Sequence, residues 1–195
     1  MSDVSAITTV SSGIAVPAPT DTARTIVVTD LGDPDIVING NEIDATVQLA
    51  YQLFEGAGLV APDAVIRFHR TTPACNGYYQ SHADASPTVE VCYTSENPQG
   101  LDIQRLRVLS HELAHAYVEP RLDRPTRVAL LDLLGLERWT GDEWQELGSE
   151  HAAEVLVWGM LDGQYRLHDR LEALDRSTLD TVYGLLTGAD AGATG

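Results

Sequence analysis

The sequence predicts an α+β fold in a single domain. Its 195 residues, 44% of them hydrophobic, suit one globular unit with its own core. β-branched runs and one amphipathic helix occupy the first half, and helical periodicity fills the second, which is the order typical of this class. We place the domain at residues 25–188. Flexible ends are expected at residues 1–24 and 189–195, which are rich in small and polar residues.

The elements expected in the first half form a small sheet with one helix. β-branched runs at residues 25–29 and 36–38, bounded by turn formers, predict short strands. Apolar residues at helical spacing from Ile43 to Phe54 predict a helix, which the glycines that follow bring to an end. The alternating segment Thr88 to Tyr93 predicts a strand that returns along a strand from Val65 to Arg70. We therefore expect a mostly antiparallel sheet.

The second half predicts four helices. Asp102 can cap the first of them, and Pro120 stops its apolar stripe. Proline near the start and glycine at the end bound the second, across residues 125–135. Apolar periodicity predicts the third helix across residues 149–160 and the fourth across residues 175–186. A helical C-terminal part therefore follows the sheet.

Composition excludes two classes of partner. Acidic residues number 29 against 12 basic ones, which gives a net charge of -17 that would repel a phosphate backbone. No segment has the long apolar run of a transmembrane span. We therefore expect neither a nucleic-acid partner nor a membrane.

The two cysteines, Cys75 and Cys92, leave two interpretations open. They flank an expected hairpin connection, where a disulfide would add about 3 kcal/mol in the chain-entropy model, whereas two reduced thiols would merely pack. The cellular compartment of the protein also stays open, because two observations disagree. The lack of a recognisable leader favours the cytoplasm, while a disulfide would favour an exported context.

The segment "HELAH" carries the chemistry that the sequence predicts. His111 and His115 are four residues apart, so on a helix both imidazoles project from one face and can reach the same ion. Glu112 lies one position further round, where it can accept a proton from a zinc-bound water. The alternative is a helix face that merely carries two histidines. We expect one Zn²⁺ per chain.

A third ligand has to come from elsewhere in the chain. The metzincin pattern requires Gly and His at the third and sixth positions after the second histidine, and Val118 and Arg121 occupy them here. A downstream helix instead presents Glu150 and Glu154 one turn apart on the same face. Glu150 is the candidate ligand, and Glu154 is the candidate acceptor for the imidazole of His111.

These motifs resemble those of the gluzincin metallopeptidases, in which HExxH is followed by a helix bearing ExxxD or a close variant. More narrowly, the chain is similar to minimal gluzincin-like HExxH proteins, whose second helix often carries "AAEV…WG". The resemblance covers about residues 65–163 and implies a zincin-like fold, with the sheet packed on the HExxH helix. The roles that it implies are zinc ligation by His111, His115 and Glu150, general-base catalysis by Glu112, and orientation of a ligand by Glu154. Because Glu replaces the commoner Asp in that last role, which of Glu150 and Glu154 binds metal stays open.

An oxyanion donor is also required, and several residues are candidates. Tyr165 and His168 follow the second motif helix, while Tyr78, Tyr79 and His82 in the hairpin connection are equally suitable. The sequence does not rank these five residues.

The expected function is that of a zinc-dependent metallopeptidase, a hydrolase that cleaves peptide or protein substrates through a zinc-bound water activated by Glu112. By resemblance, the substrate adds as a strand along Thr88 to Tyr93, for which the alternative is a plain core strand. One competing function is a catalytically silent zincin-fold module for binding or regulation. Another is a structural metal site closed by a fourth ligand, either His151 or Glu154.

Overall fold

The computed structural model describes residues 25–28, 40–70, 77–83, 85–93, 103–163 and 165–188. The two expected flexible ends and the expected strand at residues 36–38 lie outside this part of the chain. Its elements are β1 (Thr25–Val28), α1 (Gly40–Gly56), β2 (Val65–Arg70), β3 (Gly77–Gln80), β4 (Thr88–Tyr93), α2 (Ile103–Val118), α3 (Arg124–Leu134), the 3-10 turn η1 (Trp144–Glu146), α4 (Gly148–Met160), α5 (Asp169–Glu172) and α6 (Arg176–Thr187). The α+β class and the main helices are therefore confirmed.

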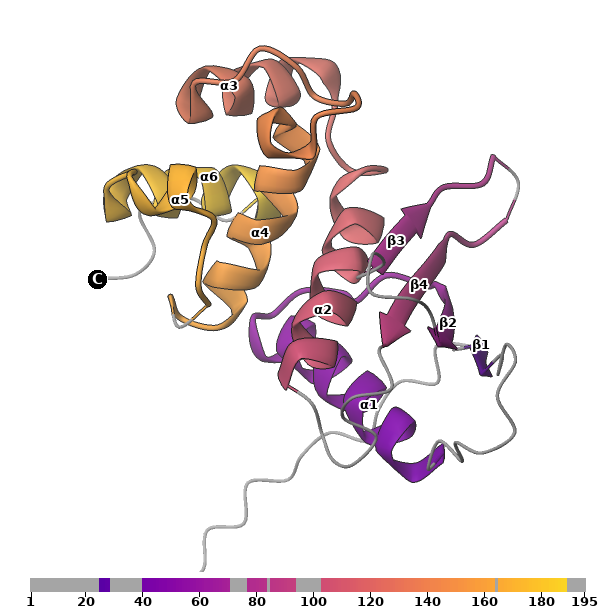
Figure 1. The fold of residues 1–195 in the computed structure, drawn as a ribbon. Coiled ribbons are helices and arrows are strands. Elements are labelled where there is room, and N and C mark those ends of the chain that lie inside the picture. The colour runs from indigo at the N-terminus through magenta and orange to yellow at the C-terminus, as the bar shows by residue number, and fades with distance from the viewer. Residues whose placement is uncertain are drawn as a thin grey trace, which may run out of the picture.

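The sheet is mixed, and the expectation of a mostly antiparallel one was wrong. Its strand order is β1-β2-β4-β3, with parallel pairing of β1 to β2 and of β2 to β4 and antiparallel pairing of β4 to β3 (Figure 1). Helix α1 connects β1 to its parallel neighbour β2, as such a crossover requires. Strand β3, whose residues we expected in a loop, forms the hairpin with β4, so that β4 runs parallel to β2.

Helix α2 lies at the centre of the molecule, between the sheet and α4 (Figure 1). Its apolar residues Leu109 and Leu113 are fully buried, and so are Val89 and Val91 of β4 and Leu156 of α4. Because α2 is covered on most sides, three of its polar residues, Ser110, Glu112 and His115, are buried as well. A buried polar group is stabilised by a partner, so the surroundings of Glu112 and His115 decide their chemistry.

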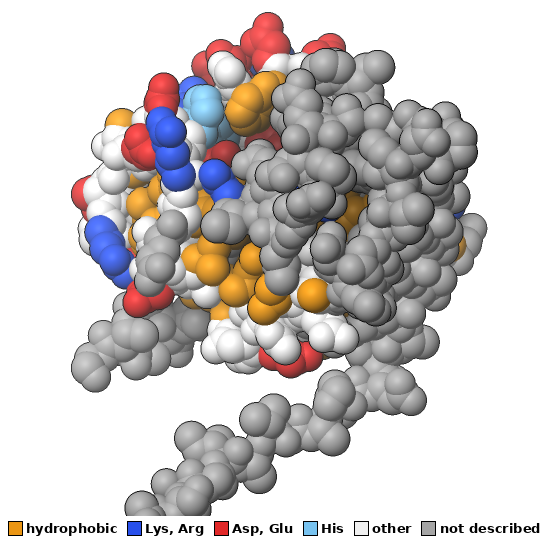
Figure 2. All heavy atoms as spheres, turned by 60° about the horizontal axis from the view of Figure 1, so that its bottom comes forward, with side chains coloured by type: hydrophobic (Ala, Val, Ile, Leu, Met, Phe, Trp, Pro, Cys, Tyr) orange, Lys and Arg blue, Asp and Glu red, His pale blue; other side chains and the backbone are white. Residues whose placement is uncertain are grey.

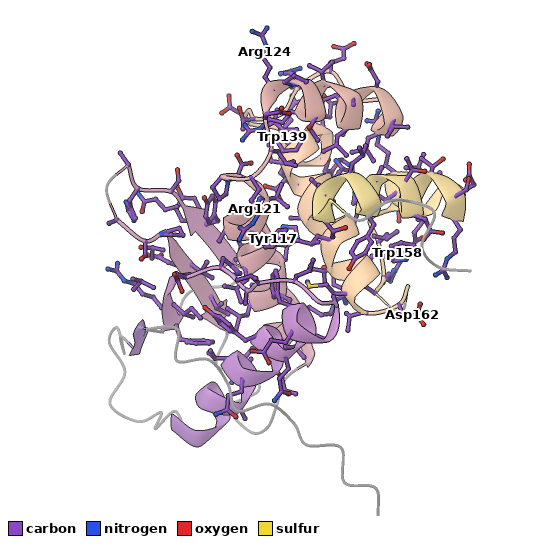
Figure 3. All side chains as sticks on the ribbon, turned by 180° about the vertical axis from the view of Figure 1, so that it is seen from behind. Tyr117, Arg121, Arg124, Trp139, Trp158 and Asp162 are labelled. Carbon is purple, nitrogen blue, oxygen red and sulfur yellow. The ribbon has the colours of Figure 1, made fainter. Side chains whose placement is uncertain are left out.

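Arginines hold the C-terminal end of α2 in place. The guanidinium of Arg121 lies 4.0 Å from the centre of the Tyr117 ring and donates a hydrogen bond to the Tyr117 carbonyl at 2.8 Å (Figure 3). Arg127 donates to the carbonyl of Glu119 at 2.7 Å, and the Trp139 indole donates to the carboxylate of the same residue at 3.0 Å. Cations at this end complement the helix dipole, so the orientation of α2 is fixed where α3 begins.

Figure 2 shows one face of the molecule, on which acidic, basic and apolar side chains are all present. In the view of Figure 2, Asp and Glu side chains lie around the edge, and apolar side chains gather nearer the centre. None of the helices in the described ranges combines the length and the apolar character that crossing a membrane requires.

Candidate metal centre

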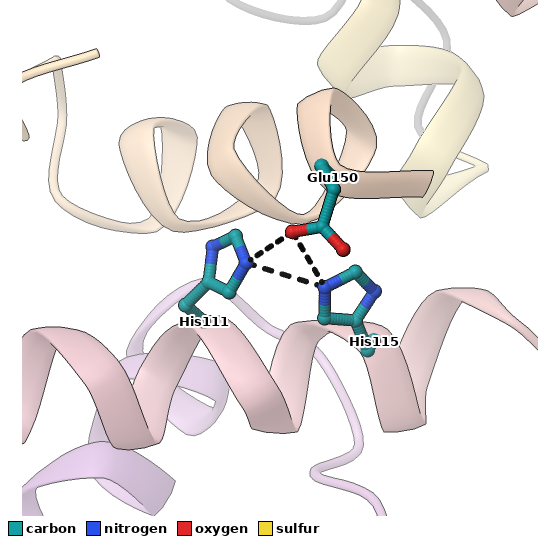
Figure 4. Close-up of side chains that lie close together, drawn as sticks. All are labelled: His111, His115 and Glu150. Atoms are coloured by element: carbon teal, nitrogen blue, oxygen red, sulfur yellow. Dashed lines mark hydrogen bonds and ion pairs between the residues drawn. The ribbon is translucent and has the colours of Figure 1, made fainter. Parts of the chain in front are cut away.

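Two helices that are distant in sequence bring three metal-ligating side chains together. His111 and His115 project from α2 toward the first turn of α4, where Glu150 faces them (Figure 4). The Nε2 atom of His111 lies 3.1 Å from Oε2 of Glu150, the Nε2 atom of His115 lies 3.4 Å from the same oxygen, and 3.2 Å separates the two nitrogens. These ligand atoms are the three that could hold a metal ion among the described residues.

The geometry of this trio fits a tetrahedral ion. Zinc–ligand bonds of about 2.0–2.1 Å at tetrahedral angles place neighbouring ligand atoms about 3.3 Å apart. The three measured separations fall close to that value, and all three atoms lie within 4.8 Å of one another. Two histidines and one carboxylate are a donor set of catalytic zinc sites, which leave a fourth coordination position open.

The electrostatics of Glu150 favour a bound cation. Burial alone would raise the pKa of this carboxyl. Hydrogen bonds from His111 and His115, together with the charges of those imidazoles, outweigh burial and hold the pKa well below its usual range. Glu150 therefore stays ionised and offers a carboxylate ligand to a cation.

The two other acidic or basic candidates on α4 are engaged elsewhere. His151 is buried, and its Nδ1 atom lies 2.9 Å from the carbonyl oxygen of Leu147. Glu154 accepts a hydrogen bond from the backbone N–H of His168 at 3.1 Å. Within the described ranges no hydrogen bond joins Glu154 to His111, so the structure does not bring together the expected carboxylate–imidazole pair. Glu154 instead satisfies its carboxylate with the backbone N–H of His168, in the segment that follows α4.

Glu112 lies beside the trio, beneath strand β3. Its side chain is 8% exposed. A Cβ atom placed on Gly77 would lie 2.5 Å from Oε1 of Glu112 and 2.6 Å from Val108, so only glycine allows the strand to cover the carboxyl this closely. Burial raises the pKa of Glu112 to about 7, which His111 partly offsets and Glu150 reinforces. A carboxyl with this pKa is suited to accept and return a proton near neutral pH.

A cleft of about 840 Å³ opens over these residues. One wall is β3, the floor is the exposed face of α2, and the opposite wall comes from α4 and the segment before it. The residues that line it are Gly77, Tyr78, Tyr79, Gln80, Ser81, Arg107, Val108, His111, Glu112, His115, Glu119, Thr140, Gly141, Trp144, Leu147, Ser149, Glu150, Glu154 and Tyr165. An extended ligand can therefore reach the trio from solvent.

The five candidate oxyanion donors fall into two groups. Tyr165, Tyr78 and Tyr79 line the cleft. His168 and His82 are not among its lining residues, and His82 instead contacts the hydroxyl of Thr88 at 3.0 Å. Burial, with Glu154 nearby, raises the pKa of Tyr165, so its hydroxyl keeps the proton that a donor needs.

The strand expected to receive a substrate is not at the edge of the sheet. Strand β4 lies between β2 and β3, so both of its edges are already paired and Thr88–Tyr93 cannot accept an added strand. The edge strand beside the cleft is β3. Its four residues were missed because they are too few for a clear alternation, although the Tyr78-Tyr79 pair is a strand-favouring signal.

Arg107 also lines the cleft and was not among the predicted site residues. Its position could have been inferred from the sequence, because it precedes His111 by four residues and so lies on the same helix face. The proposed disulfide stays a prediction, since Cys75 and the side chain of Cys92 lie outside the described part of the chain.

The chain matches no protein-family model, no curated protein and no solved structure. Its function therefore has to be argued from its own residues.

Proposed function

We propose that this protein is a zinc-dependent metallopeptidase of the gluzincin type with a zincin-like fold. The observation that carries the proposal is the convergence of His111, His115 and Glu150 at distances suited to tetrahedral zinc, next to a buried Glu112 in an open cleft. A structural zinc site would be closed by a fourth protein ligand. Here the nearest candidates, His151 and Glu154, have other partners.

The roles of the chain's residues follow from their positions. Zn²⁺ bound by the trio supplies Lewis-acid chemistry, because it polarises a substrate carbonyl and lowers the pKa of water. Glu112 accepts the proton of the attacking water and then passes it to the amine leaving group, a role that suits a buried carboxyl beside the trio. Tyr165, which lines the cleft, would donate a hydrogen bond to the oxyanion that develops on the carbonyl.

Strand β3 provides the binding surface for an extended peptide. It is the edge strand of the sheet and lines the cleft, so its unpaired backbone groups can hydrogen-bond an added strand. Substrates would then lie along β3 and pass over the trio. This assignment replaces the one expected for β4.

The test compares wild type with Glu112→Gln, and uses Glu146→Gln as a matched control at an exposed position outside the cleft. Zinc per chain and the unfolding temperature are measured for each protein, and cleavage of a mixed peptide library is followed by mass spectrometry. We expect all three to bind one zinc and to fold. Cleavage should fall by about 10²- to 10⁴-fold in Glu112→Gln alone.

Two outcomes would contradict this proposal. Failure of the wild type to bind zinc after reconstitution would remove the metal centre. Zinc binding without cleavage by any variant would instead favour a catalytically silent binding module.

A further inference from the structure

Among the described residues that line the cleft, Arg107 is the basic one apart from the two histidines of the trio. It precedes His111 by a single helical turn, so it lies on the same face of α2 and about 6 Å away along the helix axis. Four carboxylates line the same cleft: Glu112, Glu119, Glu150 and Glu154. The cleft is therefore acidic, and Arg107 is the guanidinium that its described lining residues supply.

The guanidinium of Arg107 is held in place without an ion pair. It lies 4.7 Å from the centre of the Tyr165 ring and donates a hydrogen bond to the carbonyl of Arg166 at 3.3 Å. No carboxylate of a described residue lies within ion-pair distance of it, although Arg67, Arg127, Arg138, Arg166 and Arg176 all have such partners. A guanidinium has five N–H donors, so these contacts orient Arg107 and leave donors for a ligand.

We propose that Arg107 binds a carboxylate of the substrate. The inference rests on the proposed peptidase function and deepens it by naming a substrate class: peptides that carry a carboxylate near the hydrolysed bond. The planar guanidinium matches a carboxylate in a bidentate geometry, and apart from the metal centre it is the cation that the described lining residues offer to an anionic group of a ligand.

Two sources offer the same chemistry, the C-terminal carboxylate of a peptide and the side chain of Asp or Glu. The experiment separates them with two matched pairs of random hexapeptide libraries. One pair ends in a free acid or an amide. The other pair ends in an amide and contains a fixed central Glu or Gln.

Cleavage of each library is measured for wild type, Arg107→Gln and the control Arg166→Gln. The control removes the same charge from a side chain that is 78% exposed and does not line the cleft, and it keeps the carbonyl that accepts from Arg107. We expect the wild type to prefer one acid library by about 10- to 100-fold, as for a charge-assisted hydrogen bond, and Arg166→Gln to keep that preference. In Arg107→Gln the ratio should fall to near one.

A binding readout makes the result independent of turnover. The zinc-loaded Glu112→Gln protein, with and without Arg107→Gln, is incubated with each library, and retained peptides are quantified after ultrafiltration. Enrichment of an acid library that Arg107→Gln abolishes supports the carboxylate site, even if the wild type cleaves nothing and the peptidase proposal fails. Because each ratio compares two ligands on one protein, partial unfolding cancels. If Arg107→Gln does not fold, Arg107→Lys replaces it. We then expect an intermediate acid-to-amide ratio, because Lys keeps the positive charge but cannot make the bidentate hydrogen bonds of a guanidinium.

Equal treatment of acid and amide libraries by the wild type would overturn the inference. So would a preference that Arg107→Gln retains in full, because Arg107 would then serve only to offset the repulsion among the glutamates of the cleft.

Discussion

Two glutamates that line the cleft have pKa values shifted in opposite directions. On the sheet side, Glu112 lies beneath Gly77 of β3, and burial raises its pKa to about 7. On the helical side, burial also opposes ionisation of Glu150, but hydrogen bonds from two imidazoles hold its pKa well below the usual range. Both carboxyls line one cleft, so the difference comes from what covers each of them.

This contrast separates two chemical tasks. A carboxyl that is covered by backbone and apolar atoms can carry a proton at neutral pH, whereas one that is surrounded by imidazoles keeps its charge and attracts a cation. Glu150 also raises the pKa of Glu112, so the two tasks support each other. The cleft therefore holds a proton acceptor, Glu112, directly beside the cation site formed by His111, His115 and Glu150.

Removing the cation site should have the largest effect. In Glu150→Gln the trio loses its carboxylate ligand, so we expect zinc affinity to fall by more than the roughly 100-fold that loss of an outer partner costs. Peptide cleavage should fall to background. Competition with a fluorescent zinc chelator measures the affinity, with Glu146→Gln as the exposed control. Unchanged zinc affinity would remove Glu150 from the ligand set.

The second effect concerns the proton acceptor in the metal-free protein. The pKa of Glu112 is about 7 when folded and near 4.5 when unfolded, so the folded state holds its proton to higher pH and the wild type loses stability as pH rises through this window. Gln does not titrate and resembles the protonated acid. Relative to wild type, Glu112→Gln should therefore gain on the order of 3 kcal/mol between pH 4.5 and pH 8.

Urea unfolding in the presence of EDTA at those two pH values measures this difference. The metal-free Glu150→Gln variant should behave in the opposite sense, because it loses a carboxyl whose folded pKa is depressed and whose stabilisation is present above the unfolded pKa. A stability difference between Glu112→Gln and wild type that does not change with pH would show that Glu112 is not held protonated by its surroundings.

The sequence predicted those parts of the molecule that depend on local pattern. Helix α2 has apolar residues at helical spacing, and α4 is a continuous run of helix-compatible, mostly apolar residues. The positions of His111 and His115 on one face follow from helical geometry alone. The parallel pairing of β2 with β4 could not be predicted in this way. It depends on β3 taking the outer position, and four residues are too few to signal a strand.

Within the site, the sequence indicated which residues could bind a metal but not which partners they have. Glu150 and Glu154 share a helix face, and only the tertiary structure places one near the imidazoles and the other near the backbone of His168. The role of Gly77 is likewise set by the approach of β3 to α2. Such contacts join distant segments, so local propensity carries no information about them.

A third variant tests the cover over the proton acceptor. In Gly77→Ala the new methyl group would meet Glu112 and Val108 at 2.5 and 2.6 Å, so we expect a stability loss of about 1–3 kcal/mol from overpacking. Zinc affinity should be kept, while cleavage falls because the carboxyl is displaced. Gly56→Ala is the control, since a Cβ there would meet nothing within 4 Å. Normal cleavage by Gly77→Ala would show that the position of Glu112 does not depend on β3.

The smallest expected effect belongs to Glu154, which lies on the same wall as Glu150 but has a different partner. Its carboxylate accepts from the backbone N–H of His168, so Glu154→Gln should weaken one charge-assisted hydrogen bond and cost about 1 kcal/mol of stability. Zinc affinity should change by less than about 3-fold, whereas a carboxylate that oriented His111 would cost about 10- to 100-fold. The chelator competition used for Glu150→Gln distinguishes these results. A small change in zinc affinity would mean that Glu154 serves to hold the segment after α4. A large change would mean that metal binding draws Glu154 to the imidazole of His111, so that two successive turns of α4 support the cation site.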